Sequence, residues 1–173
     1  MNYRPAKESD LPRLMSMADQ AIAYFRASGI DQWQKGEPNR NGLLKSIKDR
    51  ALYILEDAGE AAAMITLAQG PELSYEEIDG AWLNDAPYYA FHRVCVEGSR
   101  KGRGYASLLF SESERHVLSL GISNVRIDTH PDNRSMQRAL EKSGYVRCGS
   151  LILKDGSEAG DLRLAYQKVL RPL

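Results

Sequence analysis

The sequence has 173 residues, a length that suits one compact domain, and we expect a single domain over residues 1–173. Hydrophobic residues make up 43% and charged residues 27% of the chain, which excludes the disordered and collagen-like classes. Lysine plus arginine and aspartate plus glutamate number 23 each, so the chain lacks the overall positive charge on which nonspecific nucleic-acid binding depends. Any anion-binding site must therefore be built locally.

Cysteine usage and hydropathy favour a cytoplasmic location. Cys95 and Cys148 lie far apart without metal-ligand spacing, and we expect both to be buried small side chains. The charged N-terminal segment lacks the apolar stretch of a secretory signal. The longest weakly polar run, Ala61–Ala68, is far shorter than the roughly 20 residues that a membrane helix needs. We therefore predict a cytoplasmic protein with no metal site and no nucleic-acid or membrane partner.

The first quarter of the chain predicts a short strand and two helices. Residues 2–6 are extended in this interpretation, and Ser9 is the expected N-cap of the helix that follows. Apolar side chains at three- and four-residue spacing then define one helix face: Leu11, Leu14, Met15, Ala18, Ile22 and Phe25. Gly29 is placed to end this helix. A second, weaker helix runs through Leu43, Leu44 and Ile47.

The middle of the chain predicts three strands and one long polar segment. Runs that begin at Ala51 and Ala61 are joined by the turn residues 57–59, which predicts an antiparallel hairpin. Residues 69–88 are polar, and a connection of that length is often either a loop on the substrate side or a solvated insertion. Residues 89–96 are rich in aromatic and β-branched side chains and predict a strand.

The last part of the chain predicts two helices and three strands. One helix face is formed by Ala106, Leu109, Phe110, Ser113, Val117 and Leu120, and Gly121 ends that helix. A strand from Asn124 precedes a short helix that Gly144 ends. Strands follow over residues 145–153 and 162–169. Hairpins mixed with crossover helices indicate an α/β or α+β domain on a mixed sheet.

The most informative segment is Val96–Ala106, where a strand leads through a glycine-rich turn into a helix. The start of a helix leaves about four backbone N–H groups unpaired and carries roughly half a positive charge, so it attracts an anion. Gly102 and Gly104 remove Cβ atoms where a pyrophosphate would approach. Three cations add local positive charge: Arg100, Lys101 and Arg103. The segment therefore predicts a diphosphate-binding turn.

Two other glycine motifs fit this segment poorly. The Walker pattern Gly-x-x-x-x-Gly-Lys-Ser/Thr is absent, and Ser107 stands at the third glycine position of a dinucleotide fingerprint. A nucleotide-phosphate enzyme is a remoter alternative, which would require ATP and Mg²⁺, and no carboxylate pattern here calls for a metal. A solvated basic turn without a ligand is the remaining alternative.

The segment resembles motif A of the GCN5-related N-acetyltransferases, whose pattern is Gln or Arg, two variable residues, Gly, a variable residue, then Gly or Ala. Residues 101–106, Lys-Gly-Arg-Gly-Tyr-Ala, fit this pattern with Lys101 in place of Gln or Arg. The segment Tyr3–Leu14 resembles the first strand and helix of the family, and Asn133–Tyr145 resembles its motif B. The resemblance implies a mixed, largely antiparallel central sheet of about seven strands with helices on both faces.

The resemblance also implies a cofactor and a reaction. It implies that acetyl-CoA is bound and that its acetyl group passes directly to a primary amine of a small molecule or peptide. Backbone hydrogen bonds to pantetheine would come from Val94, Cys95 and Val96, on a strand that in the family splays from the next parallel strand. The pyrophosphate would be held by Lys101, Gly102, Arg103, Gly104, Tyr105 and Ala106. Asn133 would lie beside the pantetheine arm.

Three residues are candidates for the catalytic proton transfers. In the family branch that acetylates protein N-termini, a base carboxylate stands five residues before the motif B Asn, the position of Asp128. Its shorter side chain would act through one bridging water. His130 shares a strand face with Asp128, and we expect His92 to share one with Val94 and Val96. Each also has an ordinary alternative: a hydrogen-bond acceptor for Asp128, a turn cap for His130 and a packed side chain for His92.

The general acid is where the sequence departs from the family pattern. Many members place a Tyr seven residues after the motif B Asn, and here that position is Leu140. Tyr145, Tyr105 or Ser135 could donate the proton instead, or water could, because a leaving thiol is acidic. The oxyanion would be stabilised by a backbone N–H group of the Val94–Val96 strand.

The acceptor site should lie opposite the cofactor, and Tyr24, Trp33 and Trp82 are its candidate residues. Neither cysteine has a Cys/His/Asn arrangement, which favours direct transfer over a covalent enzyme intermediate. A non-catalytic acyl-CoA sensor is the second hypothesis, motivated by Leu140 and the short Asp128 side chain. A homodimer is left open by the sequence.

Overall fold

The computed structural model describes residues 1–172 and shows a mixed α/β fold. Its four α-helices are α1 (Leu11–Ala27), α2 (Arg40–Lys48), α3 (Tyr105–Ser119) and α4 (Arg134–Lys142). The strands are β1 (Asn2–Pro5), β2 (Leu52–Asp57), β3 (Glu60–Gln69), β4 (Asp79–Gly80), β5 (Tyr89–Val96), β6 (Asn124–Thr129), β7 (Val146–Ile152) and β8 (Leu162–Val169). Three short 3₁₀ turns are η1 (Glu8–Asp10), η2 (Leu73–Tyr75) and η3 (Gly98–Arg100).

The strands follow the order β1-β2-β3-β5-β6-β8-β7-β4 in one largely antiparallel sheet, in which β5 and β6 run parallel. This confirms the predicted fold class. The additional strand, β4, lies in the segment that the sequence predicted to be a loop. It has only two residues, Asp79 and Gly80, so no alternating apolar pattern exists to reveal it.

The chain forms two compact units, which are described separately. The first contains residues 1–67 and 92–112, and the second contains residues 68–91 and the described residues from 113 onward. Strand β5 and helix α3 each pass from one unit to the other. No helix within residues 1–172 is both long and apolar enough to span a bilayer, and no cluster of metal-ligating side chains is found in the same range. The single domain and the cytoplasmic location stay predictions, and a homodimer stays open.

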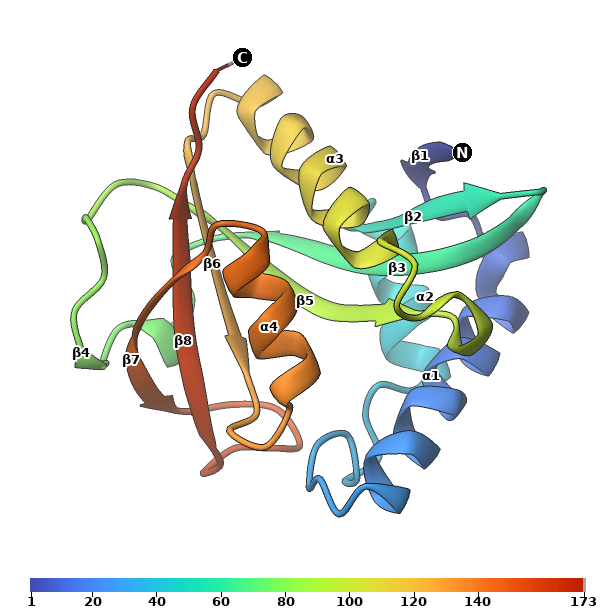
Figure 1. The fold of residues 1–173 in the computed structure, drawn as a ribbon, viewed down its shortest axis with the longest axis horizontal. Helices are drawn as coiled ribbons and strands as arrows, with labels where there is room; N and C mark the ends of the chain where they lie inside the picture. The colour runs from blue at the N-terminus through green and yellow to red at the C-terminus, as the bar shows by residue number, and fades with distance from the viewer. Residues whose placement is uncertain (173) are drawn as a thin grey trace. The chain divides into compact units, whose positions relative to one another are not determined.

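In the first unit, β1, β2 and β3 lie side by side, and α1 and α2 pack against one face of them (Figure 1). The predicted hairpin between β2 and β3 is confirmed. Its two turn residues, Ala58 and Gly59, have φ values of 52° and 80°, the left-handed pair that suits the twist of a two-residue hairpin. The core between helices and strands includes Leu14, Met17, Leu43, Ile54 and Met64.

The start of α1 differs from the prediction. Ser9 lies inside η1 and is not the N-cap, because η1 precedes the helix and Asp10 occupies the cap position. The carboxylate of Asp10 accepts a hydrogen bond from the backbone N–H of Lys7 at 2.7 Å and ion-pairs with Arg4 at 2.8 Å. On the predicted buried face of α1, Met15 and Ile22 are only partly buried; Met17 and Ala21 are buried instead.

In the second unit, β8 lies between β6 and β7 and is antiparallel to both. Residues Tyr89–Phe91 of β5 pair in parallel with Val125–Ile127 of β6. Helix α4 covers one face of these strands (Figure 1). Strand β4 pairs with β7 at a point where two backbones meet closely: a Cβ on Gly149 would lie 2.0 Å from the carbonyl oxygen of Asp79. Glycine is therefore required there.

Both cysteines are free thiols, but they differ in exposure. Cys95 is buried, as predicted, with 5% of its surface exposed. Cys148 is partly exposed, so the prediction that both are buried is wrong for this residue. It lies on β7 at the register shift beside β8, where regular alternation of buried and exposed side chains is interrupted.

Candidate active site

The turn between β5 and α3 is held in place by its own side chains. The Glu97 carboxylate accepts hydrogen bonds from the backbone N–H of Ser99 at 3.1 Å and from its hydroxyl at 2.5 Å. The Ser99 hydroxyl bond is the main reason why the pKa of Glu97 lies below its ordinary value. From the other side, the N–H of Gly98 donates to Oε1 of Gln20 on α1 at 3.0 Å. The turn is therefore a defined structure braced against α1.

Two of its three glycines adopt a backbone conformation that other residues rarely reach. Gly102 and Gly104 have φ values of 73° and 85°, and a Cβ added to either would meet no atom within 4 Å. Their lack of side chains thus leaves open space beside the backbone. The first N–H to close a helical hydrogen bond is that of Leu108, to the Gly104 carbonyl at 3.1 Å. The preceding amides of α3 have no intrahelical acceptor, as expected at a helix start.

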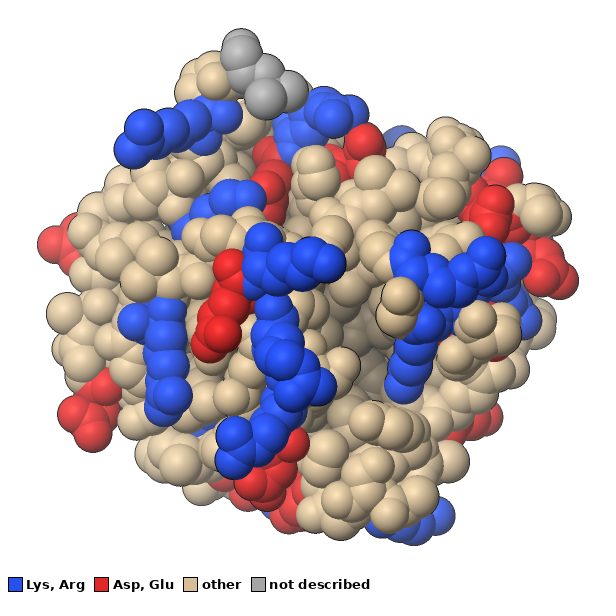
Figure 2. Space-filling model, viewed as in Figure 1, with Lys and Arg blue, Asp and Glu red and all other residues tan. Residues whose placement is uncertain are grey.

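The three predicted cations of the turn divide into two kinds. Arg100 is largely buried, at 15% side-chain exposure, and its guanidinium lies 3.6 Å from both Asp57 and Glu97. Lys101 and Arg103 are exposed, and Lys101 Nζ lies 4.0 Å from the ring centroid of Tyr24. Lys and Arg side chains gather on the surface over this turn in Figure 2. Arg100 braces the turn, whereas the other two cations are available to an anion.

The C-terminal half of β5 is irregular. Arg93 has a left-handed φ of 53° between His92 and Val94, so the extended backbone is interrupted there. The simple alternation that predicted a shared face for His92, Val94 and Val96 does not apply across this residue. Val94 and Val96 are partly buried.

Cys95 faces the core of the first unit. Its Sγ lies 3.5 Å from the carbonyl oxygen of Met17 on α1. Burial raises the pKa of the thiol to about 12, which keeps it protonated near neutral pH. A thiol in this state is a poor nucleophile.

In the second unit, Asp128 lies within a group of polar side chains. Its Oδ2 accepts a hydrogen bond from the Tyr75 hydroxyl at 2.6 Å, and its Oδ1 lies 3.9 Å from Nε of Arg163. Arg163 also donates to Glu158 at 2.7 Å. Burial, and then the Asp128 charge, raise the pKa of Tyr75 well above its ordinary value. Tyr75 and Arg163 were not predicted, because neither lies near Asp128 in the sequence.

His130 and Asn133 both stabilise the turn before α4. Nδ1 of His130 accepts a hydrogen bond from the backbone N–H of Asp132 at 3.0 Å. Oδ1 of Asn133 accepts one from the N–H of Met136 at 3.1 Å, so Asn133 is the N-cap of α4. These contacts match the turn-cap alternative for His130, and they leave the predicted catalytic and cofactor roles of both residues as predictions.

The candidate proton donors are engaged with carboxylates. The Tyr105 hydroxyl donates to Asp57 at 2.7 Å, and the Tyr145 hydroxyl donates to Glu114 at 2.9 Å. Burial raises the pKa of Tyr145 well above its ordinary value. Ser135 is exposed, and Leu140 is fully buried.

The three predicted acceptor-site aromatics each have a packing partner. Tyr24 is 46% exposed and lies under Lys101, on the side of the glycine turn. The Trp33 ring meets Phe25 edge-to-face with ring centroids 5.6 Å apart. Trp82 stacks on the Arg126 guanidinium at 4.3 Å, and its Nε1–H donates to the Tyr75 carbonyl at 2.9 Å. Their proposed roles in acceptor binding stay predictions.

The chain is similar in sequence to known acetyltransferases. The model of the acetyltransferase (GNAT) family matches residues 16–145. A curated relative, the S-(2-succino)cysteine N-acetyltransferase of Bacillus subtilis, is 26% identical over 154 residues, which cover 89% of each chain.

Solved structures agree with the family match. An acetyltransferase of the GNAT family from Streptococcus agalactiae has 32% identity and a TM-score of 0.89, with 99% of this chain and 96% of that chain covered. The structure of yncA from Salmonella typhimurium with its cofactor acetyl-CoA shares the fold, with 14% identity, a TM-score of 0.69 and coverage of 98% and 94%.

These matches establish the protein family of the chain. The chain belongs to the GNAT family of acetyltransferases, as its residues 101–106 and 133–145 suggested. Acetyl-CoA is the cofactor of this family.

Proposed function

We propose that this protein is an acetyl-CoA-dependent N-acetyltransferase that transfers an acetyl group directly to a primary amine. The observation that carries the proposal is the turn before α3. Left-handed Gly102 and Gly104, with open space where their side chains would be, lead into helical amides beside exposed Lys101 and Arg103. Backbone N–H groups with nearby cations form the arrangement that binds a diphosphate.

The residues of this turn fit acetyl-CoA. We propose that Lys101–Ala106 hold the pyrophosphate, and that the backbone of Val94–Val96 holds the pantetheine arm. Asn133 is proposed as a further contact to that arm. When bound, acetyl-CoA supplies an acyl group activated as a thioester. A backbone N–H of the Val94–Val96 segment would stabilise negative charge that develops on the acyl oxygen.

Direct transfer is favoured by the state of the buried cysteine. The thiol of Cys95 has a pKa of about 12 and makes its contact with the Met17 carbonyl inside the core. No activating His is within hydrogen-bond distance of either cysteine among the described residues. The amine itself is therefore the proposed nucleophile.

The amine must lose a proton, and Asp128 is the proposed acceptor of that proton through one water. Oδ2 accepts the hydrogen bond from the Tyr75 hydroxyl, and Oδ1 lies 3.9 Å from Nε of Arg163, so we propose that Oδ1 receives the proton. His130 and His92 are the alternative bases. Because Tyr105 and Tyr145 both donate to carboxylates, we propose that water protonates the leaving thiolate.

The named relative suggests which amines to test first. It is an N-acetyltransferase of S-(2-succino)cysteine, a carboxylate-rich amino acid with a primary amine. We propose a small-molecule amine of the amino-acid type as the acceptor, with peptide N-termini as the second class.

Thiol release from acetyl-CoA tests this proposal. The protein is incubated with acetyl-CoA and a panel of S-substituted cysteines, other amino acids, polyamines, aminoglycosides and peptides, and free CoA is followed with a thiol reagent. Acceptor-dependent release, with the acetylated amine identified by mass spectrometry, is the expected result. Calorimetric CoA binding without release on any amine would instead identify a non-catalytic sensor.

A further inference from the structure

Arg93 has an unusual backbone conformation. Four non-glycine residues within residues 1–172 have a positive φ: Trp33, Arg50, Ala58 and Arg93. Of these, Arg93 alone lies inside a strand. A side chain with a Cβ disfavours this conformation, and such outliers concentrate at ligand-binding sites. The backbone conformation alone does not show that Arg93 binds a ligand. The environment of its guanidinium group is therefore the second piece of evidence.

The Arg93 guanidinium lies against helix α2 in the first unit. Nη1 donates to the hydroxyl oxygen of Ser46 at 2.8 Å. Nη2 lies 3.5 Å from the position that a Cβ on Gly42 would occupy, so the guanidinium faces the first turn of the helix. Because Ser46 lies near the other end of α2, the guanidinium extends along the side of this helix.

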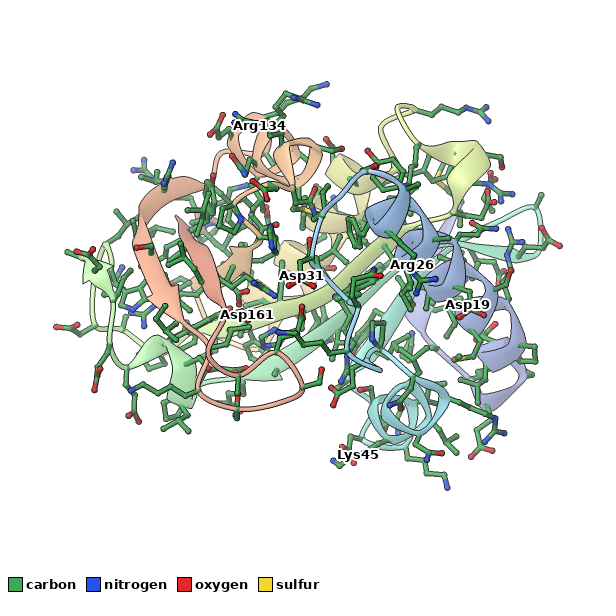
Figure 3. All side chains as sticks on the ribbon, turned by 90° about the horizontal axis from the view of Figure 1, so that it is seen from below. Asp19, Arg26, Asp31, Lys45, Arg134 and Asp161 are labelled. Atoms are coloured by element: carbon green, nitrogen blue, oxygen red, sulfur yellow. The ribbon has the colours of Figure 1, made fainter. Side chains whose placement is uncertain are left out.

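Other charged groups nearby do not neutralise Arg93. The charge of Glu37 acts on it through space, but no carboxylate lies within 4.0 Å of it among the described residues. The first turn of α2 contains no acidic side chain. Lys45 points outward from α2 (Figure 3) and pairs with Asp49 at 2.5 Å. Arg93 is thus a partly buried cation with one neutral hydrogen-bond partner.

A guanidinium has five N–H donors in a planar fork that matches the two oxygens of a carboxylate. Arg93 also directly precedes Val94, the first residue of the proposed pantetheine segment. The proposed diphosphate turn follows the opposite end of that segment, after Val96. The Val94 end is the one at which the acyl group and the acceptor amine would meet.

We propose that Arg93 binds a carboxylate of the acceptor and thereby selects amines that carry one, such as amino acids and their conjugates. This inference rests on the proposed function and narrows its substrate class. Arg93 is a specificity-determining residue: it holds the acceptor and takes no part in the proton transfers.

Matched acceptors test the selection. Each S-substituted cysteine that is acetylated is compared with its carboxamide, in which the α-carboxylate is neutral. The wild-type protein is expected to prefer the acid by at least 20-fold in kcat/KM. Arg93→Gln is expected to remove this preference, mainly through a higher KM for the acid, while the amide changes less than threefold.

Arg50→Gln is the matched control, because Arg50 is also an arginine with a left-handed φ, 56°, but is exposed. It should leave both acceptors unchanged. CoA affinity, measured by calorimetry, should stay within twofold in both variants. An equal loss for acid and amide in Arg93→Gln, or a wild-type protein that does not distinguish them, would overturn the proposal.

A binding measurement separates this inference from the proposed function. Succinate should raise the melting temperature of the wild-type protein and of Arg50→Gln, and it should not do so for Arg93→Gln. If no amine is acetylated while this succinate effect holds, the proposed function fails and the carboxylate site stands. If Arg93→Gln does not fold, Arg93→Lys replaces it, with a weakened preference for the acid expected because the planar fork is lost.

Discussion

Comparing Gly104→Ala with a control glycine variant distinguishes an effect on cofactor binding from a general effect of backbone strain. With a φ of 85°, an alanine here would adopt the left-handed region, which costs about 1–2 kcal/mol. Gly121, at the end of α3, has a φ of 81° and the same open space around an added Cβ. Gly104→Ala and Gly121→Ala should therefore lose similar stability, with melting temperatures lower by about 2–8 °C.

Only Gly104→Ala should weaken CoA binding. The methyl group would occupy the open space beside the turn, and relief of strain would move an amide that we propose donates to phosphate. Loss of one such charge-assisted hydrogen bond costs about 1.5–3 kcal/mol, or about 10- to 150-fold in Kd. Calorimetric titration with CoA measures Kd, and differential scanning fluorimetry checks the matched stability. Equal CoA affinity in both variants would refute the assignment of this turn to the diphosphate.

Three further predictions concern variants of single residues, each based on one contact in the structure. Cys95→Ala should keep most of the turnover, because a thiol with a pKa of about 12 is not the nucleophile; loss of turnover with intact CoA binding would contradict direct transfer. Tyr24→Ala should weaken CoA binding severalfold, while Tyr24→Phe keeps it, because a ring 4.0 Å from Nζ of Lys101 positions that cation; calorimetry would show no difference between them if the ring is irrelevant. Asp10→Asn should lower the melting temperature at pH 7. The hydrogen bond from Arg4 lowers the Asp10 pKa below 3.8, so its contribution is present above that value and disappears as pH falls through the lower folded pKa. A melting difference that persists unchanged at pH 2 would contradict this role of the carboxylate.

Most of the fold could be predicted because its signals are local. The periodicity of α1 and α3, the turn at Ala58–Gly59 and the terminating Gly121 and Gly144 each act within a few residues. Strand β4 was missed because its pairing depends on the close approach of Gly149 to Asp79, which lies far away in the sequence. The cap of α1 was placed at Ser9 because the intervening 3₁₀ turn has no distinct pattern.

The structure around the candidate site was predictable only where the motif is contiguous in the sequence. The glycine turn carries its own signal in its spacing, whereas the partners of Asp128 come from Tyr75 and Arg163. The left-handed residue in β5 was also missed, because an arginine in a run of aromatic and β-branched residues indicates a regular strand.

The anion contacts that we propose come from cations without a carboxylate partner. Arg100, which the sequence grouped with its neighbours, is neutralised by Asp57 and Glu97 and stabilises the turn. Lys101, Arg103 and Arg93 have no ion pair within 4.0 Å among residues 1–172. These cations flank the Val94–Val96 segment on its two sides along the chain. We propose that Lys101 and Arg103 on one side of the segment bind the diphosphate, and that Arg93 on the other side binds the carboxylate of an acceptor.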